Sequence, residues 1–161
     1  MGARSNRTVG GSLLVVVGLM AAGCAERRDG AASSDPELAK RGTIEVTAKL
    51  VEVPAKAIFK RDLYNYATVL KYQVLEVHRG KVKGEIIYVG HNNPFNPRSE
   101  AADKRAPDIG GNLKEFRAGQ VHRMALEDSI ADHFSGAILN LYSEEDIDPV
   151  YWAVWTNLVS E

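Results

Sequence analysis

The chain has 161 residues, of which 45% are hydrophobic and 25% charged, and its formal net charge at pH 7 is −1. This length fits one domain plus a targeting segment and excludes two substantial domains, and the nearly neutral charge argues against nucleic-acid binding, which needs a basic face. A single cysteine excludes an internal disulfide, so an apolar core has to stabilise the fold.

The first 23 residues have the features of a secretion signal. Arg4 and Arg7 lie in a short polar start, and residues 12–22 are apolar. A helix of that length rises only about 16 Å, whereas the hydrocarbon core of a bilayer is roughly 30 Å thick. The segment is therefore predicted to be a signal peptide that is too short to span a membrane.

The signal ends in Ala21-Ala22-Gly23-Cys24, which resembles the lipobox of bacterial lipoproteins. In that family the cysteine thiol is diacylated (palmitate is a typical acyl group), the signal is cut before it, and the acyl chains give stable anchoring. Ala21 departs from the family, where Leu is more usual. Because Ala25 is not Asp, the resemblance favours the outer membrane of a diderm cell. The alternatives are a plain secretory signal with a chance cysteine and a retained amphipathic anchor.

Residues 24–42 are small, polar and charged, which is the composition of a flexible tether. Asp35-Pro36-Glu37 could start one helical turn, with Pro at the first helical position. Otherwise we expect no stable structure before about Gly42. Residues 43–161 are predicted to form one β-rich globular domain.

The first predicted strand covers residues 43–53. Its apolar residues alternate with Thr and charged residues, and the alternation slips at 50–53, which indicates a bulge before Pro54. After a connector at 55–65, residues 66–78 give the strongest strand pattern, with apolar side chains on both faces. Residues 85–91 form its return strand across a Gly-containing turn, which predicts a long hairpin whose first strand is central or covered.

Residues 92–119 form a long irregular loop rich in Pro and Gly, in which 99–104 could make one helical turn. Further short strands are predicted at 120–126, 136–142 and 151–156. The connections between them are a segment with one helical turn around 130–134 and an acidic loop at 143–148. Five or six short strands with little helix predict an all-β fold with minor α content, either a small barrel or a sandwich.

The segment from Val69 to Leu126 resembles the netrin-like domains of the metalloproteinase-inhibitor superfamily, which have an OB-type barrel. The shared features are a Val-rich hairpin around Gly80, a following loop, and the Phe116-Arg117-Ala118-Gly119 entry to the next strand. The family's cysteines are absent, including the one that forms its inhibitory wedge. The resemblance therefore implies a small OB-like or netrin-like barrel and not protease inhibition.

The candidate ligand-binding residues lie in and around the long loop. We expect His91, Asn93 and Arg98 to face a ligand, because Arg binds carboxylate or phosphate in bidentate fashion. His91 and His122 border the same loop, so the two could meet, with Asp103 or Asp108 as a third ligand of a zinc or iron site. A rigid Asn-capped turn and ordinary surface histidines are the alternatives.

The sequence contains no convincing catalytic motif. No serine lies in a nucleophile elbow, and the acidic residues 144–148 lack the spacing of a calcium loop. We therefore expect a lipid-anchored module of the bacterial cell envelope or periplasm, without cofactor, that binds an envelope protein, peptide or small ligand. The alternatives are a metal-dependent envelope enzyme that uses His91 and His122 and a structural component of an envelope assembly.

Overall fold

The computed structural model describes residues 2, 35–54, 66–95, 106, 108–142, 144–145 and 147–161. The predictions for the signal peptide, for Cys24, for residues 25–34 of the tether and for the helical turn at 99–104 therefore lie outside the described residues, as do Arg98 and Asp103. Within the described ranges, no helix has the length and apolar character needed to cross a bilayer.

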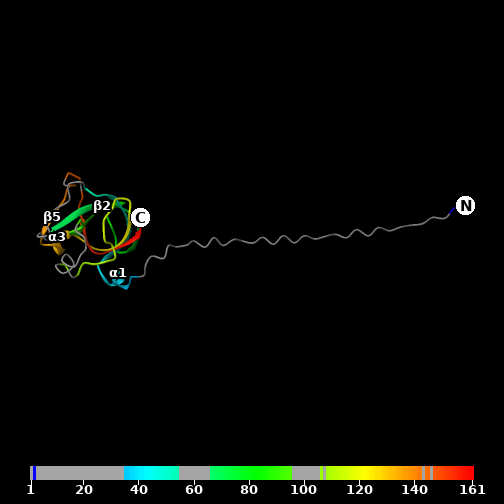
Figure 1. Ribbon diagram of the computed structural model, residues 1–161, viewed down its shortest axis with the longest axis horizontal. Helices are drawn as coiled ribbons and strands as arrows, with labels where there is room; N and C mark the ends of the chain where they lie inside the picture. The colour runs from blue at the N-terminus through cyan, green and yellow to red at the C-terminus, as the bar shows by residue number, and fades with distance from the viewer. Residues whose placement is uncertain are drawn as a thin grey trace.

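The described chain forms six strands and two short helices, so the predicted all-β class with minor α content is confirmed. In chain order the elements are α1 (Pro36–Lys40), β1 (Ile44–Glu52), β2 (Tyr66–Arg79), β3 (Ile86–Asn92), β4 (Val121–Glu127), α3 (Ile130–His133), β5 (Ala137–Leu139) and β6 (Val150–Ser160). In Figure 1 the strands wrap into a rounded body, with α1 along its lower edge and β5 and α3 on the side away from the C terminus.

Five of the strands close into a barrel. The hydrogen-bonded order is β1-β4-β6-β3-β2, and β2 pairs with β1 to complete the ring. All pairs in the ring are antiparallel except β3 with β6. The remaining strand, β5, lies parallel to the first residues of β2. This is the small OB-like barrel expected from the sequence.

The alternating pattern of β1 places one face of the strand in the core, as predicted. Its apolar residues Ile44, Val46, Ala48 and Leu50 are all buried in the main core. The predicted bulge is confirmed as well, because the register between β1 and β2 shifts between Leu50 and Glu52. Glu45, on the other face of β1, is also buried, at 6% exposure, which the alternating pattern did not predict.

The predicted hairpin is formed by β2 and β3, whose register runs from Ala67↔Asn92 to Gln73↔Ile86. The first half of β2 is buried on both faces, as expected, whereas most of its second half is exposed. Gly80 follows β2 with φ +75°, and a Cβ there would lie 2.8 Å from the carbonyl oxygen of Thr43. A side chain is therefore excluded at this turn.

Two predicted strands differ in length from those observed. β5 covers three residues instead of 136–142, because the chain turns where the Asn140 side chain accepts a hydrogen bond from the amide of Tyr142. The last strand, β6, continues past Thr156 to Ser160, because it pairs with β4 over its whole second half. The helical turn predicted around 130–134 is α3.

The helical turn predicted at Asp35-Pro36-Glu37 is α1, in which Asp35 is the N-cap and Pro36 lies at the first position. Leu38 is buried, with an exposed fraction of 2%. The expectation of no stable structure before Gly42 is therefore wrong for residues 35–41. A short helix with one buried leucine is too small to fold alone, so its packing on the barrel accounts for its order.

Candidate functional site

The two histidines singled out from the sequence meet inside the barrel. His91 lies in β3 and His122 in β4, and the hydroxyl of Tyr72 from β2 lies between them. The Tyr72 Oη is 3.1 Å from His91 Nε2 and 3.0 Å from His122 Nδ1. The predicted approach of the two histidines is thus confirmed. Both side chains are 1% exposed or less, whereas residues of a recognition loop would lie on the surface.

The hydrogen bonds around Gln120 fix the tautomer of each histidine. Gln120 Oε1 accepts from the amide of Arg117 at 2.9 Å and lies 3.1 Å from His122 Nε2, which must therefore donate. The Nδ1 of His122 then accepts the proton of the Tyr72 hydroxyl. Because a hydroxyl has only one proton, the Tyr72 oxygen accepts from His91 Nε2–H. The result is one directed chain of hydrogen bonds through the barrel interior.

Burial keeps the imidazole of His122 neutral. It lowers the pKa of His122 from 6.5 to about 4, because an imidazolium would lose its water without gaining an anionic partner. The Phe116 ring packs against both histidines, with ring centroids 4.6 Å from His91 and 5.6 Å from His122. The histidines are consequently part of a packed interior at neutral pH.

Of the expected ligands of a metal site, His91, His122 and Asp108 lie among the described residues. His91 Nε2 and His122 Nδ1 both face the hydroxyl of Tyr72, so a metal between them would have to displace it. Asp108 is exposed, while Asp103 lies outside the described residues. In the described part of the chain, no three His, Cys, Asp or Glu residues come close enough to hold a metal ion.

Asn93 closes the end of the hairpin and does not face solvent. It is 2% exposed and has φ +42°, a left-handed conformation that Asn tolerates well. Its amide donates to the carbonyl of Tyr66 at 3.0 Å, and its side-chain oxygen accepts from the Tyr66 amide at 3.4 Å. These contacts fit the rigid Asn-capped turn, and the expected contact of Asn93 with a ligand stays a prediction.

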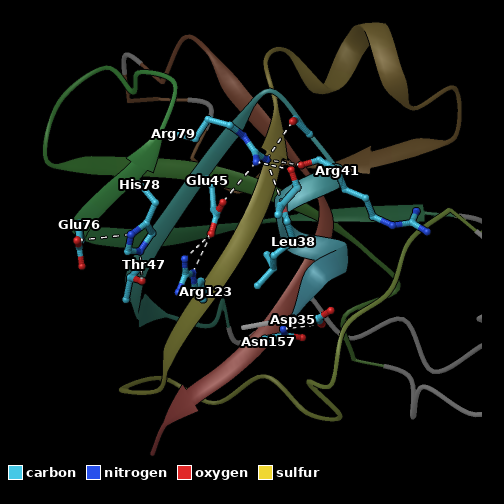
Figure 2. Close-up of polar contacts among 12 residues, drawn as sticks. Asp35, Leu38, Arg41, Glu45, Thr47, Glu76, His78, Arg79, Arg123 and Asn157 are labelled. Atoms are coloured by element: carbon cyan, nitrogen blue, oxygen red, sulfur yellow. Dashed lines mark hydrogen bonds and ion pairs between the residues drawn. The ribbon is translucent and has the colours of Figure 1, made fainter. Parts of the chain in front are cut away.

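A second polar cluster, not foreseen from the sequence, fixes α1 to the barrel (Figure 2). The Arg79 guanidinium at the end of β2 reaches the end of α1. There it donates to the backbone carbonyls of Leu38, Ala39, Arg41 and Gly42, over distances of 2.5–3.1 Å. The carbonyls of Leu38 and Ala39 are among those that a helix end leaves without internal partners, and those of Arg41 and Gly42 directly follow the helix. One side chain of the barrel therefore caps the helix.

The carboxylate of Glu45 lies between two arginines in the same cluster (Figure 2). It accepts from Arg123 Nε at 2.8 Å and lies 3.5 Å from Arg79 Nη1. At the other end of α1, Asp35 Oδ2 accepts from the side chains of Trp155 and Asn157, at 2.8 and 2.9 Å. The hydrogen bond from Asn157 contributes most to lowering the pKa of Asp35. Both ends of the helix are thus attached to the barrel.

A third cluster lies on the outer face of β2 and β3. Lys71 Nζ donates to both carboxylate oxygens of Glu145, at 2.9 and 3.3 Å, and the hydroxyl of Tyr88 donates to the same carboxylate. These bonds, the one from Tyr88 first, lower the pKa of Glu145. The sequence predicted an acidic loop at 143–148 here. It missed the pair because Lys71 and Glu145 are far apart in the chain.

Comparison with known proteins adds no relative: no family model, curated protein or solved structure matches the chain. Function therefore has to be argued from the residues and contacts described above.

Proposed function

We propose that this protein is a lipid-anchored binding module of the bacterial cell envelope, held to the membrane through Cys24. The observation that carries the proposal is the order of features at the amino terminus. A basic start, an apolar run of residues 12–22 and the Ala-Ala-Gly-Cys motif follow one another as in lipoproteins. Two or three acyl chains on Cys24 would provide stable attachment, which a single chain does not.

The attachment of α1 limits how far the barrel could lie from a lipid on Cys24. Because Asp35 is bonded to Trp155 and Asn157 of β6, only residues 25–34 separate the folded domain from Cys24. A chain of that length spans at most about 40 Å when fully extended. An acylated Cys24 would therefore keep the barrel next to the membrane surface.

The state of the histidine pair favours binding over metal-dependent catalysis. A metal ligand needs a free nitrogen lone pair directed at the ion. In the space between the rings, His122 Nδ1 already accepts the proton of Tyr72, and His91 Nε2 carries a proton that it donates to Tyr72, so neither of the two nitrogens that face this space can bind a metal there. We therefore assign the pair to the structure of the barrel and place ligand recognition on the outside.

The anchor is tested by labelling cells with an alkyne-bearing fatty acid and separating membrane from soluble protein. Cys24→Ser is the test variant, and Ser33→Ala, which leaves the motif intact, is the matched control. We expect label and membrane fractionation in the wild type and in Ser33→Ala, and neither in Cys24→Ser. A Cys24→Ser protein that kept its label would overturn the proposal.

The choice between binding module and metal enzyme is tested by elemental analysis of purified residues 25–161. The proposal expects no stoichiometric zinc or iron. Stoichiometric metal that disappears in both His91→Ala and His122→Ala, but not in the surface variant His133→Ala, would favour the enzyme. His133 is the control because it is exposed.

A further inference from the structure

The chain between β5 and β6 covers part of the outer face of the barrel. We call its described residues, 140–142, 144–145 and 147–149, the strap. Tyr142 and Ile147 of the strap pack with Val69 of β2 and Tyr88 of β3. The neighbours of Val69 and Tyr88 along each strand, such as Leu70 and Val89, belong to the main core. Because side chains alternate along a strand, the strap lies on the outside of the barrel.

The surface under the strap has the donors of a carboxylate site. Lys71 and the hydroxyl of Tyr88 converge on the carboxylate of Glu145 from two adjacent strands. The ammonium of Lys71 also lies 5.4 Å from the ring centroid of Tyr88 and 5.7 Å from that of Tyr142. A cation and a phenol that point at one place, beside an apolar surface, match a carboxylate attached to an aromatic or aliphatic group.

Among the described residues, the polar contacts that hold the strap are partly open to water. The side chain of Glu145 is 45% exposed, so its ion pair is only partly shielded from water. Before the strap, β5 pairs with β2 over three residues only. The Tyr142 hydroxyl is buried and has no hydrogen-bond partner in the described part of the chain, which is unfavourable for the closed position. A second attachment joins Lys83 Nζ to the carbonyl of Asp148 at 2.8 Å.

We propose that the strap occupies a peptide-binding site in the manner of a bound ligand, and that the natural partner is an acidic peptide segment of another protein. The partner places a carboxylate on Lys71 and Tyr88 and an aromatic or aliphatic side chain over Val69, after Glu145 and Tyr142 have moved away. This proposal rests on the proposed binding function and assigns its site. The strap then acts as a built-in competitor that lowers the affinity for the partner.

Binding is tested with a fluorescent synthetic peptide that has the sequence of residues 140–149, and with the same peptide carrying Gln in place of Glu145. The protein is the full chain, purified in detergent. Glu145→Gln loosens the strap and keeps its shape, and Glu144→Gln, a change at an exposed neighbour, is the matched control. We expect Glu145→Gln to bind the acidic peptide roughly tenfold more tightly than the wild type and Glu144→Gln do, because the strap loses the charge that Lys71 and Tyr88 bind.

The site itself is tested in the double variant Lys71→Met with Glu145→Gln. We expect it to lose the binding gained by Glu145→Gln, and we expect the Gln-containing peptide to bind the single variant at least tenfold more weakly than the acidic one. Tryptophan fluorescence of Trp152 and Trp155 reports whether each variant is folded. Equal binding of the two peptides, or binding that survives Lys71→Met, would overturn the proposal.

A readout without added ligand keeps the test independent of the peptide chosen. The amide of Glu145 donates to the carbonyl of Tyr142 within the strap, so hydrogen exchange at this amide reports loosening of this turn, which we expect when the Glu145 carboxylate no longer holds it on the barrel. It should become several-fold faster in Glu145→Gln and stay unchanged in Glu144→Gln. Unchanged exchange in both variants would show that the strap is a fixed part of the fold. That result leaves an acylated Cys24 unaffected, so it is distinguishable from failure of the membrane anchor.

Discussion

The hydroxyl of Tyr72 is the central atom of the buried histidine cluster, so Tyr72→Phe is the most informative single change. The substitution removes one oxygen and leaves the aromatic ring that packs between the two histidines. The Nε2–H of His91 then loses its acceptor and the Nδ1 of His122 loses its donor. Both histidines are buried, so water cannot readily replace the lost bonds.

The cost follows from these two groups. A buried polar group that loses its partner costs about 1–3 kcal/mol, so two such groups cost about 2–5 kcal/mol after partial relaxation. A small domain has a total stability of about 5–15 kcal/mol, so the loss would be a large fraction of it. Tyr142→Phe is the matched control, because its hydroxyl is buried with no hydrogen-bond partner among the described residues. Its removal should change stability by less than about 0.5 kcal/mol or increase it.

Urea unfolding of residues 25–161 at pH 7.5 measures the stability of the wild type and of both variants, with Trp152 and Trp155 of β6 as fluorescent reporters. We expect a clear fall in the midpoint for Tyr72→Phe and little change for Tyr142→Phe. If Tyr72→Phe lies within about 0.5 kcal/mol of the wild type, or if the two variants behave alike, the directed chain through the barrel is refuted.

Three further predictions concern pH, the helix and a turn. The pKa of His122 is about 4 in the folded chain and 6.5 in the unfolded chain, so its contribution to the unfolding free energy is fully present above pH 6.5 and falls by about 3 kcal/mol as the pH drops to 4. When the unfolding free energy is measured against pH, this fall should be missing in His122→Gln. Arg79→Met should free α1, seen as faster hydrogen exchange at Arg41, and destabilise the chain by about 2–4 kcal/mol; unchanged exchange would contradict the capping role. Gly111→Ala should lower stability by more than about 2 kcal/mol in thermal unfolding, because φ is +119° and a Cβ would lie 2.0 Å from the carbonyl oxygen of Thr156; a neutral result would refute the close approach.

The strands were predictable where the sequence has a local two-residue period. The buried face of β1 and the hairpin of β2 and β3 follow from alternation and from the glycine at position 80. The parallel pairing of β3 with β6, in contrast, joins residues about sixty positions apart and leaves no local pattern. The sequence alone therefore did not predict how the barrel closes.

The candidate site was predictable only where it depends on residues that border the same stretch of the sequence. His91 and His122 border one long loop, which was enough to expect that they meet. Their burial and the position of Tyr72 between them depend on the register of strands that are distant in sequence, and a shift by one residue would have turned each side chain to the other face. The Arg79 cap and the pair of Lys71 with Glu145 likewise depend on contacts between segments that no spacing rule connects.

The membrane anchor is the claim on which the proposed function depends, and the intact mass of the protein extracted from membranes tests it most directly. We expect a polypeptide that begins at Cys24 and carries two or three acyl chains on that residue. A polypeptide that begins elsewhere, or that carries an unmodified thiol at position 24, would contradict the account.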